Sequence, residues 1–540
     1  MLRPLLLASA ALALAGCGDP PVPDRPNVLV ISVDTLRADA LGCYGAEHPT
    51  SPNIDALAAD GVLCVNAVST TSWTLPAHVS MLTGLDISAH GMCDERVLSA
   101  SHKQGVRPPL KGDFVSQSFQ RAGYRTAGLY TWKYLEPRFG FGLGFDDWRR
   151  VGSTIFSNDE LRERYERLRD AGDEEAVRRW AEESPQDFDL QAPTNQVVVD
   201  EALAWLDEGG HGAEGGEPFF LFLHLFDVHD EYVAPPPFDT RFDPDYDGPV
   251  DGRKVTSPDS LVDEHMPARD LDNLRSRYLG EVAWTDHQLG RLFDELERRG
   301  LTEDTLIVLT SDHGEEFFEH GKKAHRTQLY RESVQVPLIF SWPGGLPSGL
   351  RVDGVTGIVD LAPTLAALAD IPGPEAVCGT DLSAVLRGEA PNEERAYLSE
   401  LLVFRGKSNS PEHHLSIHLG DEHLVRRRSS KGTFELHRYD RAADPLELGP
   451  GERHGPGTPA FQRFTELLAP LRDRAQAARD ASPWPGTRLG GIDEDTADEL
   501  AAMGYLGDTS DTGTLRSTER LCLDGCLGVP TTAPPTPDSQ

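Results

Sequence analysis

Basic residues are scarce in this chain. Its 540 residues include 51 lysines and arginines against 87 aspartates and glutamates, which gives a formal charge of −36 at pH 7. A field of that sign repels polyanions and argues against nucleic acid or an anionic membrane surface as the main partner. An anionic substrate would have to be bound by local cations, by a metal ion or by the positive ends of helix dipoles.

The chain also lacks an apolar run long enough to span a bilayer as a helix, which takes about 20 residues. A short run, Leu5 to Leu14, follows Arg3 in the layout of a secretory signal peptide. The tetrapeptide Leu14-Ala15-Gly16-Cys17 resembles the lipobox of bacterial lipoproteins, which implies cleavage before Cys17 and lipidation of that cysteine. A plain signal peptide is the alternative. We therefore predict a signal peptide over 1–16, a tether over 17–26, and an exported lipoprotein anchored to the membrane in the periplasm or at the cell surface.

Cysteine is sparse as well, with seven in the chain. The six besides Cys17 permit disulfides but assign none. Cys522 and Cys526 could pair locally, but their spacing is not that of a CxxC redox or zinc motif. Both lie in residues 508–540, whose content of Thr, Pro, Ser and Asp predicts a disordered tail.

No internal repeat is visible, and apolar runs alternate instead with helical patterns. Asn27 to Val33, Phe219 to Leu225 and Thr305 to Thr310 are apolar runs typical of strands buried on both faces of a parallel sheet. The spacing of apolar residues predicts one amphipathic helix over Asn53 to Asn66. This alternation predicts an α/β fold with a large, mainly parallel sheet flanked by helices over 27–371. Shorter runs predict a smaller α+β C-terminal subdomain over 372–507.

Acids and histidines follow each of the three predicted strands. Asp34 follows the first, Asp227 and His229 the second, and Asp312 and His313 the third. Ligands of open α/β sheets bind beyond the carboxyl ends of the strands. We therefore expect one convergent polar site.

A hydroxyl residue at the start of a predicted helix belongs to the same pattern. In TSWTLPAHVSMLTG, Pro76 suits a first helical turn and Gly84 the position just after a helix end. Thr74 lies at the entrance, where free N–H groups and the helix dipole favour phosphate or sulfate. An ordinary helix cap is the alternative reading of Thr74 alone.

Several motifs then identify a family resemblance. Between about Pro26 and Leu506 the chain contains, in order, VLVISVDTLRADALGCYG, TSPNIDALAADGVLCVNAVS, TLPAHVSMLTGL, FLFLHLFDVH and TLIVLTSDHGEEFFEHG. These motifs resemble the sulfatase family of the alkaline phosphatase superfamily. The resemblance implies that superfamily's fold and a metal-dependent hydrolase acting on sulfate or phosphate esters.

The departures from the family pattern are informative. The family's signature is Cys or Ser, any residue, Pro, Ser or Ala, then Arg, and its first residue becomes formylglycine. Here Thr74 takes that position and His78 the arginine position, while Thr35 replaces the second of two paired metal acids. Lys133 loosely matches a substrate-binding lysine motif, and His325 replaces the lysine that holds sulfate. An unmodified threonine is the nucleophile of phosphodiesterase and phosphoethanolamine-transferase relatives.

The candidate metal ligands are two carboxylates, an imidazole and a hydroxyl. Asp34, Asp312 and His313 could hold one divalent cation, with Thr74 Oγ as a fourth ligand and as the nucleophile. Oxygen ligands suit calcium or magnesium, whereas the imidazole favours zinc or manganese. The resemblance leaves a second cation open, with Asp227 as one of its ligands.

The remaining candidates would contact the substrate. His78, His229 and His325 are expected to surround the ester oxygens or to protonate the leaving group, and Lys133 is a further candidate for substrate binding. Solvated surface histidines are the alternative for His78 and His325. His224 lies within an apolar run and could be a buried histidine or a ligand.

The sequence therefore favours a metal-dependent hydrolase of phosphate or sulfate esters that forms a covalent intermediate on Thr74. Its substrate would be a small molecule or a glycan or lipid ester. One alternative is a phosphoryl transferase of the phosphoethanolamine type, which passes the same intermediate to an alcohol. The other is a non-catalytic binding protein on a sulfatase fold.

Overall fold

The computed structural model describes residues 25–93, 112–151, 194–208, 217–257, 260–403, 412–428 and 434–482, together with Arg164, Arg167, Ala176, Arg179 and Trp180. Cys17, the signal peptide, most of the tether and the tail from 508 lie outside the described residues. The predictions made for them therefore stay predictions.

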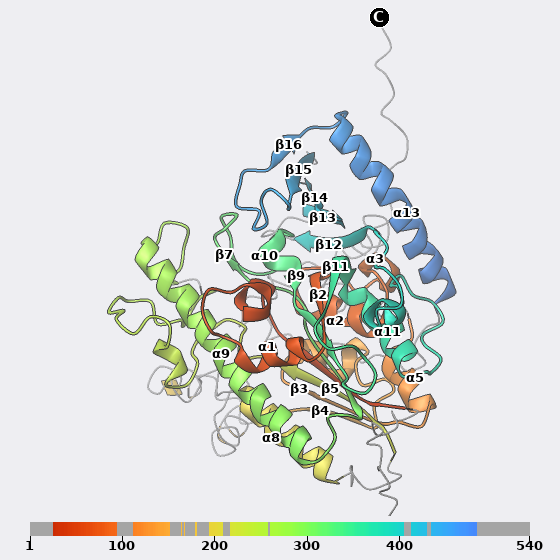
Figure 1. The fold of residues 1–540 in the computed structure, drawn as a ribbon. Helices are drawn as coiled ribbons and strands as arrows, with labels where there is room; N and C mark the ends of the chain where they lie inside the picture. Colours follow the sequence, from red (N-terminus) through yellow and green to blue (C-terminus); the bar gives the residue numbers. More distant parts are fainter. Residues whose placement is uncertain are drawn as a thin grey trace, which may run out of the picture.

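A mixed sheet forms the centre of the molecule (Figure 1). Among the described residues it has nine strands, in the order β11 (Leu350–Gly357), β2 (Val62–Val68), β10 (Leu338–Ser341), β6 (Thr305–Ser311), β1 (Asn27–Val33), β5 (Phe219–Leu225), β3 (Arg125–Tyr130) and β4 (Asp147–Arg150), with β9 (Gln335–Val336) paired to β2. The run from β6 to β4 is parallel, and only β10 and β9 are antiparallel to their described neighbours. The predicted large, mainly parallel sheet is confirmed.

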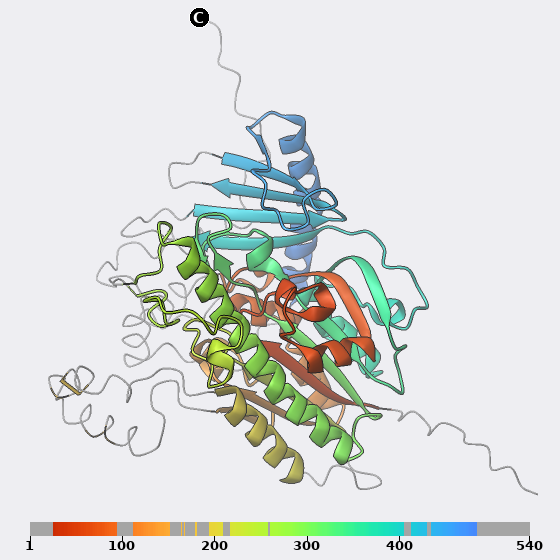
Figure 2. The same cartoon turned by 60° about the vertical axis from the view of Figure 1, so that its left-hand side comes forward.

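Helices cover both faces of this sheet because its strands are apolar on both sides. In β1, Val28 and Val30 face one core, while Leu29, Ile31 and Val33 face the other. The first core includes α2 (Thr74–Thr83), α5 (Val115–Arg121) and α11 (Leu361–Leu368); the second includes α1 (Pro52–Ala59), α8 (Thr194–Glu208) and α9 (Ala268–Arg298). Figures 1 and 2 show α8 and α9 together on one side of the sheet. Burying a Val, Leu or Ile side chain completely stabilises the folded state by about 1.5–3 kcal/mol relative to leaving it exposed.

The single helix predicted over Asn53 to Asn66 is wrong. The helix α1 ends at Ala59, and the following residues form strand β2. At the junction, a Cβ on Gly61 would lie 2.3 Å from the carbonyl oxygen of Phe340, so the chain passes close to β10 there. The run VLCVNAV then pairs with β10 and β11. Sheet pairing thus overrides the helical spacing of its apolar residues.

The C-terminal part forms a second, antiparallel sheet (Figure 2). Its described strands are β12 (Tyr397–Val403), β13 (Glu412–Leu419), β14 (Glu422–Arg428), β15 (Phe434–Asp440) and β16 (Glu452–His454). Helix α13 (Pro459–Ala481) packs Phe464, Leu468 and Leu471 against this sheet. The predicted α+β C-terminal subdomain is thus confirmed as a fold, while its boundaries at 372 and 507 stay predictions.

Several further elements are short. They are α3 (Ile87–His90), α10 (Arg331–Val334), α12 (Ser383–Leu386) and the hairpin of β7 (Glu316–Phe317) with β8 (Lys323–Ala324). Strand β12 also contacts the segment that leads into α2: Ser399 Oγ donates to the Ser69 carbonyl at 2.6 Å, and the Glu400 amide to the Thr70 carbonyl at 2.8 Å. The C-terminal sheet therefore holds the backbone segment that leads to Thr74.

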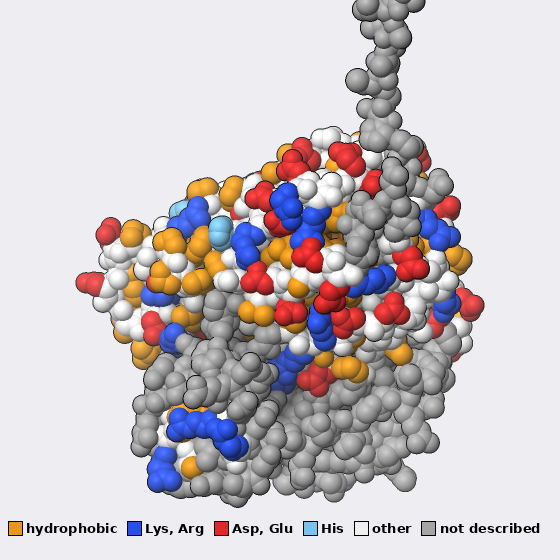
Figure 3. All heavy atoms as spheres, turned by 90° about the horizontal axis from the view of Figure 1, so that it is seen from below, with side chains coloured by type: hydrophobic (Ala, Val, Ile, Leu, Met, Phe, Trp, Pro, Cys, Tyr) orange, Lys and Arg blue, Asp and Glu red, His pale blue; other side chains and the backbone are white. Residues whose placement is uncertain are grey.

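Two further features concern the charges on the surface and the length of the apolar helices. On the face seen in Figure 3, acidic and basic side chains of the described residues are interspersed. Among the residues placed by the structure, no helix is both long and apolar enough to cross a membrane.

Candidate active site

Strand register brings the two predicted metal acids together. In the parallel pair of β1 and β6, Val33 lies opposite Ser311, so Asp34 and Asp312 follow at the same edge of the sheet. The amides of Thr35 and His313 donate to Asp312 Oδ1 at 3.3 and 2.9 Å. Both carboxylates are completely buried. The third ligand candidate, His313, directly follows Asp312.

The donor atoms of these residues fit a cation. Asp34 Oδ1 and Asp312 Oδ2 are buried and have no hydrogen-bond partner. His313 Nε2 lies 3.8 Å from Asp34 Oδ1 and 3.4 Å from Asp312 Oδ2. Its Nδ1 is bonded to the Gly314 carbonyl at 2.9 Å, so in this tautomer Nε2 carries the lone pair. Buried carboxylate oxygens without partners are costly unless a positive charge compensates them, which is what a divalent metal would provide.

Thr74 lies at the same point. It is the first residue of α2, which ends before Gly84 in the left-handed conformation (φ 71°), so the predicted helix and its end are confirmed. Thr74 Oγ1 is 3.5 Å from His313 Nε2. A hydroxyl at a helix N-terminus beside a metal site is suited to attack an anionic ester.

The turn after Asp312 depends on a glycine. A Cβ on Gly314 would lie 2.0 Å from the carbonyl oxygen of Glu332, and the Gly314 amide donates to the Ser333 carbonyl at 2.9 Å. Only glycine lets the backbone pass α10 so closely at this position. The close approach positions His313 on one side and Glu315 on the other.

Two buried histidines lie behind the carboxylates. His224 Nε2 is 3.2 Å from Asp34 Oδ2, and its Nδ1 is 2.9 Å from Thr131 Oγ1. His78 Nδ1 is bonded to the Thr74 carbonyl at 2.9 Å and Nε2 to Ser32 Oγ at 2.9 Å. Burial lowers the pKa of both imidazoles to about 4. The structure thus places His78 as a support for the Thr74 backbone, and its predicted catalytic role stays a prediction.

His229 faces the site from the loop after β5. Its Nδ1 is bonded to the Asp230 carbonyl at 2.7 Å and lies 3.0 Å from Asp230 Oδ1, whereas its buried Nε2 has no partner. Burial alone would lower the pKa of His229, but the carboxylates of Asp230, Asp34 and Glu315 outweigh it and raise that pKa to about 10. This position therefore carries positive charge at neutral pH.

His325 reaches the same space from the segment after β8. The ring centroid of His325 lies 4.7 Å from that of His229 and also 4.7 Å from that of His313. Its Nδ1 and Glu315 Oε1 share a hydrogen bond of 3.1 Å. Burial, and then the Asp230 carboxylate, raise the pKa of Glu315 to about 8. Burial, and then Asp34, raise the pKa of Asp312 to about 6. Both acids therefore hold their protons to a higher pH than an exposed carboxyl group does.

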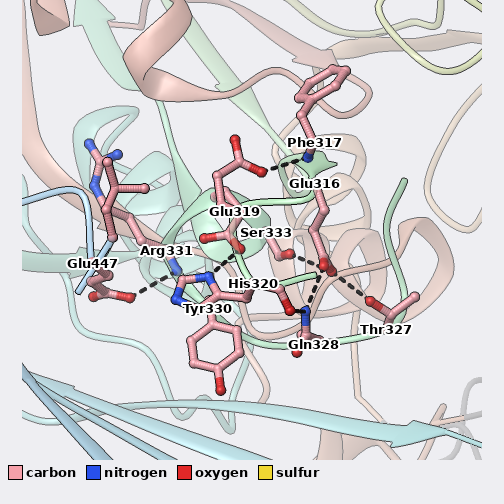
Figure 4. Close-up of polar contacts among 12 residues, drawn as sticks. Glu316, Phe317, Glu319, His320, Thr327, Gln328, Tyr330, Arg331, Ser333 and Glu447 are labelled. Atoms are coloured by element: carbon pink, nitrogen blue, oxygen red, sulfur yellow. Dashed lines mark hydrogen bonds and ion pairs between the residues drawn. The ribbon is translucent and has the colours of Figure 1, made fainter. Parts of the chain in front are cut away.

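A polar network fixes the hairpin that leads to His325 (Figure 4). Glu316 accepts hydrogen bonds from Thr327, Gln328 and Ser333, at 2.8, 2.9 and 3.0 Å. His320 Nδ1 is bonded to Glu332 at 2.7 Å, and the Arg331 amide donates to Glu447 at 3.1 Å. The network therefore connects the hairpin of β7 and β8 through α10 to the C-terminal subdomain.

Two further residues that the sequence singled out are Asp227 and Lys133. The carboxylate of Asp227 accepts hydrogen bonds from both amides at the start of α8, from the Thr194 hydroxyl and from Trp284 Nε1. The interpretation of Asp227 as a ligand of a second cation is wrong, because these four donors already occupy its oxygens. Lys133 is buried in a short 3₁₀ turn (Lys133–Leu135), and its role in substrate binding stays a prediction.

The sequence reasoning missed Asp230 and Glu315 as partners of the site histidines. Asp230 directly follows His229, and Glu315 lies within the SDHGE run. Adjacency was therefore the available signal for Asp230, whereas Glu315 bonds to His325 further along the chain and had only its place in that run as a signal. His224 remained ambiguous in the sequence because an apolar strand gives no sign of the carboxylate on its neighbour.

Comparison with known families supports the predicted fold. The profile of the family described as Sulfatase matches residues 26–371, and that of the N-sulphoglucosamine sulphohydrolase C-terminal region matches residues 318–453. Together they span both sheets of the structure.

Individual relatives agree with this assignment. The chain is 27% identical to an ulvan-active sulfatase of Formosa agariphila, over 84% of this chain and 81% of that protein. It is 24% identical to an N-acetylglucosamine-6-O-sulfatase of Bacteroides thetaiotaomicron, over 82% and 86%. Its fold matches the crystal structure of a phosphonate monoester hydrolase of Agrobacterium radiobacter with a TM-score of 0.61, at 24% identity and covering 84% and 96% of the two chains.

Proposed function

This chain belongs to the sulfatase family and is a hydrolase of ester bonds, and we propose that it cleaves phosphate or sulfate esters through a covalent intermediate on unmodified Thr74. The observation that carries the proposal is the position of Thr74 Oγ1, at the start of α2 and 3.5 Å from His313 Nε2. The buried, partnerless oxygens of Asp34 and Asp312 complete the same pocket.

The proposed reaction has two displacements. Thr74 Oγ loses its proton to solvent and bonds to the phosphorus or sulfur, while the bond from that atom to the ester oxygen breaks. The leaving oxygen takes up a proton and departs as the alcohol. Water then attacks the intermediate, releases phosphate or sulfate, and restores the threonine hydroxyl.

The chain's own residues have separate roles in this scheme. A divalent cation held by Asp34, Asp312, His313 and Thr74 would lower the pKa of the attacking hydroxyl and offset the charge of the ester. His78 holds the backbone of Thr74 through its carbonyl. His325 lies between the rings of His229 and His313, and we assign His229 and His325 to the ester oxygens. His229, with its raised pKa, would supply the positive charge there, whereas burial lowers the pKa of His325 to about 4 and leaves it a neutral hydrogen-bonding group.

We further propose that phosphate esters are preferred over sulfate esters. A formylglycine hydrate can expel sulfate by collapsing to the aldehyde, whereas a threonine ester cannot. Its intermediate must be cleared by attack at phosphorus or sulfur, and water attacks more readily at phosphorus when a cation neutralises the anion.

The test is a panel of 4-nitrophenyl sulfate, phosphate monoester and phosphate diester, assayed on purified enzyme whose Thr74 is shown by mass spectrometry to be unmodified. We expect faster turnover of a phosphate ester, and a rapidly quenched sample should carry the added group on Thr74. Faster cleavage of the sulfate by enzyme with intact threonine would contradict the preference. Transfer of the group to an added alcohol instead of water would indicate a transferase.

A further inference from the structure

An arginine that the proposed reaction does not use lies against the residue before the nucleophile. Arg326 directly follows His325, and its amide donates to the Ser72 carbonyl at 2.8 Å. Its guanidinium carbon lies 4.3 Å from the centroid of the Trp73 ring. Trp73 in turn directly precedes Thr74. Both the backbone and the side chain of the arginine therefore contact the segment from which α2 begins.

The backbone of Arg326 has a conformation that glycine adopts more easily. Its φ is +63°, in the left-handed region that is unfavourable for a residue with a Cβ atom. Hydrogen bonds hold the residues on either side, because His325 Nδ1 is bonded to Glu315 at 3.1 Å and Thr327 Oγ1 donates to Glu316 at 2.8 Å. Residues other than glycine that are held in such conformations cluster at active sites and ligand-binding positions. The chain thus accepts an unfavourable backbone conformation at a residue that brings a positive charge beside the site.

The support of this guanidinium is rigid. The Trp73 side chain is 3% exposed, and its ring packs edge-on against Tyr134 with centroids 5.4 Å apart. Arg326 itself is half-buried, so part of its surface meets solvent. A guanidinium over an aromatic face has its N–H groups in its own plane, where they match the two oxygens of a carboxylate or phosphate. It also keeps its charge at any pH at which the protein is folded.

The position of Arg326 relates it to one part of the ester. We have assigned the group that is transferred to Thr74, His229 and His325, whereas the Arg326 guanidinium lies over Trp73. The part of the substrate nearest to Arg326 is then the alcohol. The formal charge of the chain is −36, so a second negative charge on that alcohol would be repelled unless a local cation bound it.

We propose that Arg326 determines specificity by binding a second anionic group, a carboxylate or a further phosphate or sulfate, on the alcohol part of the ester. The inference rests on the proposed function, because it names the class of ester that is cleaved at Thr74. Arg326 contacts the substrate away from the reacting atoms, so its contribution is to substrate binding rather than to the chemical step.

The experiment compares phenylphosphonate with 2-, 3- and 4-carboxyphenylphosphonate, which resemble the ester but contain no bond that the enzyme can hydrolyse. Their affinities are measured by titration calorimetry on the purified, metal-loaded full chain. We expect at least one carboxylated probe to bind the wild type about 10–100-fold more tightly than phenylphosphonate does. Arg326→Met retains an apolar stem that can cover Trp73 and should remove most of this preference. Arg326→Lys should keep part of it, because it retains the charge without the planar fork.

The matched control is Arg298→Met, which removes an arginine that is 65% exposed at the end of α9 and should keep the wild-type preference. Equal affinity of the wild type for all the probes, or a preference that persists in folded Arg326→Met, would overturn the inference and leave the proposed function standing. Absence of both phosphonate binding and ester turnover would contradict the proposed function, and the inference with it. Should Arg326→Met fail to fold, Arg326→Gly decides, because glycine suits the backbone conformation at this position.

Discussion

His224 and Asp34 are joined through His224 Nε2 and Asp34 Oδ2, which are 3.2 Å apart between two fully buried side chains. Thr131 Oγ1 engages the other ring nitrogen at 2.9 Å, so His224 donates to the carboxylate from Nε2. The contact crosses from β5 to the end of β1, and it leaves Asp34 Oδ1 directed to the metal group. His224 is therefore a positioning residue for the proposed cation.

Replacing His224 should weaken metal binding without removing a ligand. His224→Phe keeps an aromatic ring and deletes the hydrogen bond, so we expect the metal affinity and kcat/KM to fall by about 10–100-fold. His224→Gln can still donate to Asp34 and should recover part of that loss. Metal titration and steady-state kinetics measure both effects, with His287→Gln, at an exposed position of α9, as the control. Unchanged metal affinity in His224→Phe would contradict the role.

Removing the Thr74 hydroxyl should abolish most turnover. Thr74→Ala is expected to lose several orders of magnitude in kcat, as found when a covalent nucleophile is removed. Thr74→Ser keeps a hydroxyl at the start of α2 and should retain part of the activity. The Ala variant should still bind metal through Asp34, Asp312 and His313. A Thr74→Ala enzyme that turns over at the wild-type rate would show that another group attacks the ester.

Acid should destabilise the protein in part through His90, in α3. Its Nδ1 accepts a hydrogen bond from the Met92 amide at 3.0 Å, and its Nε2 is bonded to Ser80 Oγ at 3.0 Å. Burial, and then the charge of Arg479 on α13, lower the pKa of His90 to about 3. The unfolded chain, with a pKa of about 6.5 at this residue, therefore binds the proton first. The contribution of His90 to the free energy of unfolding is therefore fully present above a pH of about 6.5. It falls by up to about 1.4 kcal/mol per pH unit as the pH drops toward 3.

The measurement for His90 is the free energy of unfolding in urea at several pH values between 7 and 4. His90→Gln can form both hydrogen bonds without titrating, so its unfolding free energy should depend less steeply on pH. His265→Gln should leave the wild-type slope unchanged, because its side chain is exposed. Equal slopes for His90→Gln and the wild type would contradict the assignment.

The N-terminal segment carries a prediction that lies outside the described residues. We propose that Cys17 is lipidated and that the mature protein is tethered to a membrane of the exporting cell. Mass spectrometry of the purified protein should show an acylated N-terminal cysteine, and Cys17→Ala should release the protein from the membrane fraction. Cleavage at another residue, or an unmodified Cys17, would contradict it.

The sequence by itself determined the central strands of the sheet and the helix that begins at Thr74. The apolar runs that lead to Asp34 and Asp312 predict strands buried on both faces. In the structure the residues of these strands alternate between the two cores. Pro76 and Gly84 bound the helix that begins at Thr74 for local backbone reasons alone. These features follow from short-range physical preferences, which a single chain segment contains in full.

Tertiary structure decided what the segments do to one another. The run after Gly61 became strand β2 because β10 and β11 offered it partners, which its helical spacing could not reveal. Asp227 became a cap for α8, and His224, His78, Asp230 and Glu315 became partners of the site through contacts between separate elements. A hydrogen bond between residues far apart in the chain depends on strand register and loop path, and those are properties of the packed molecule rather than of any one stretch of it.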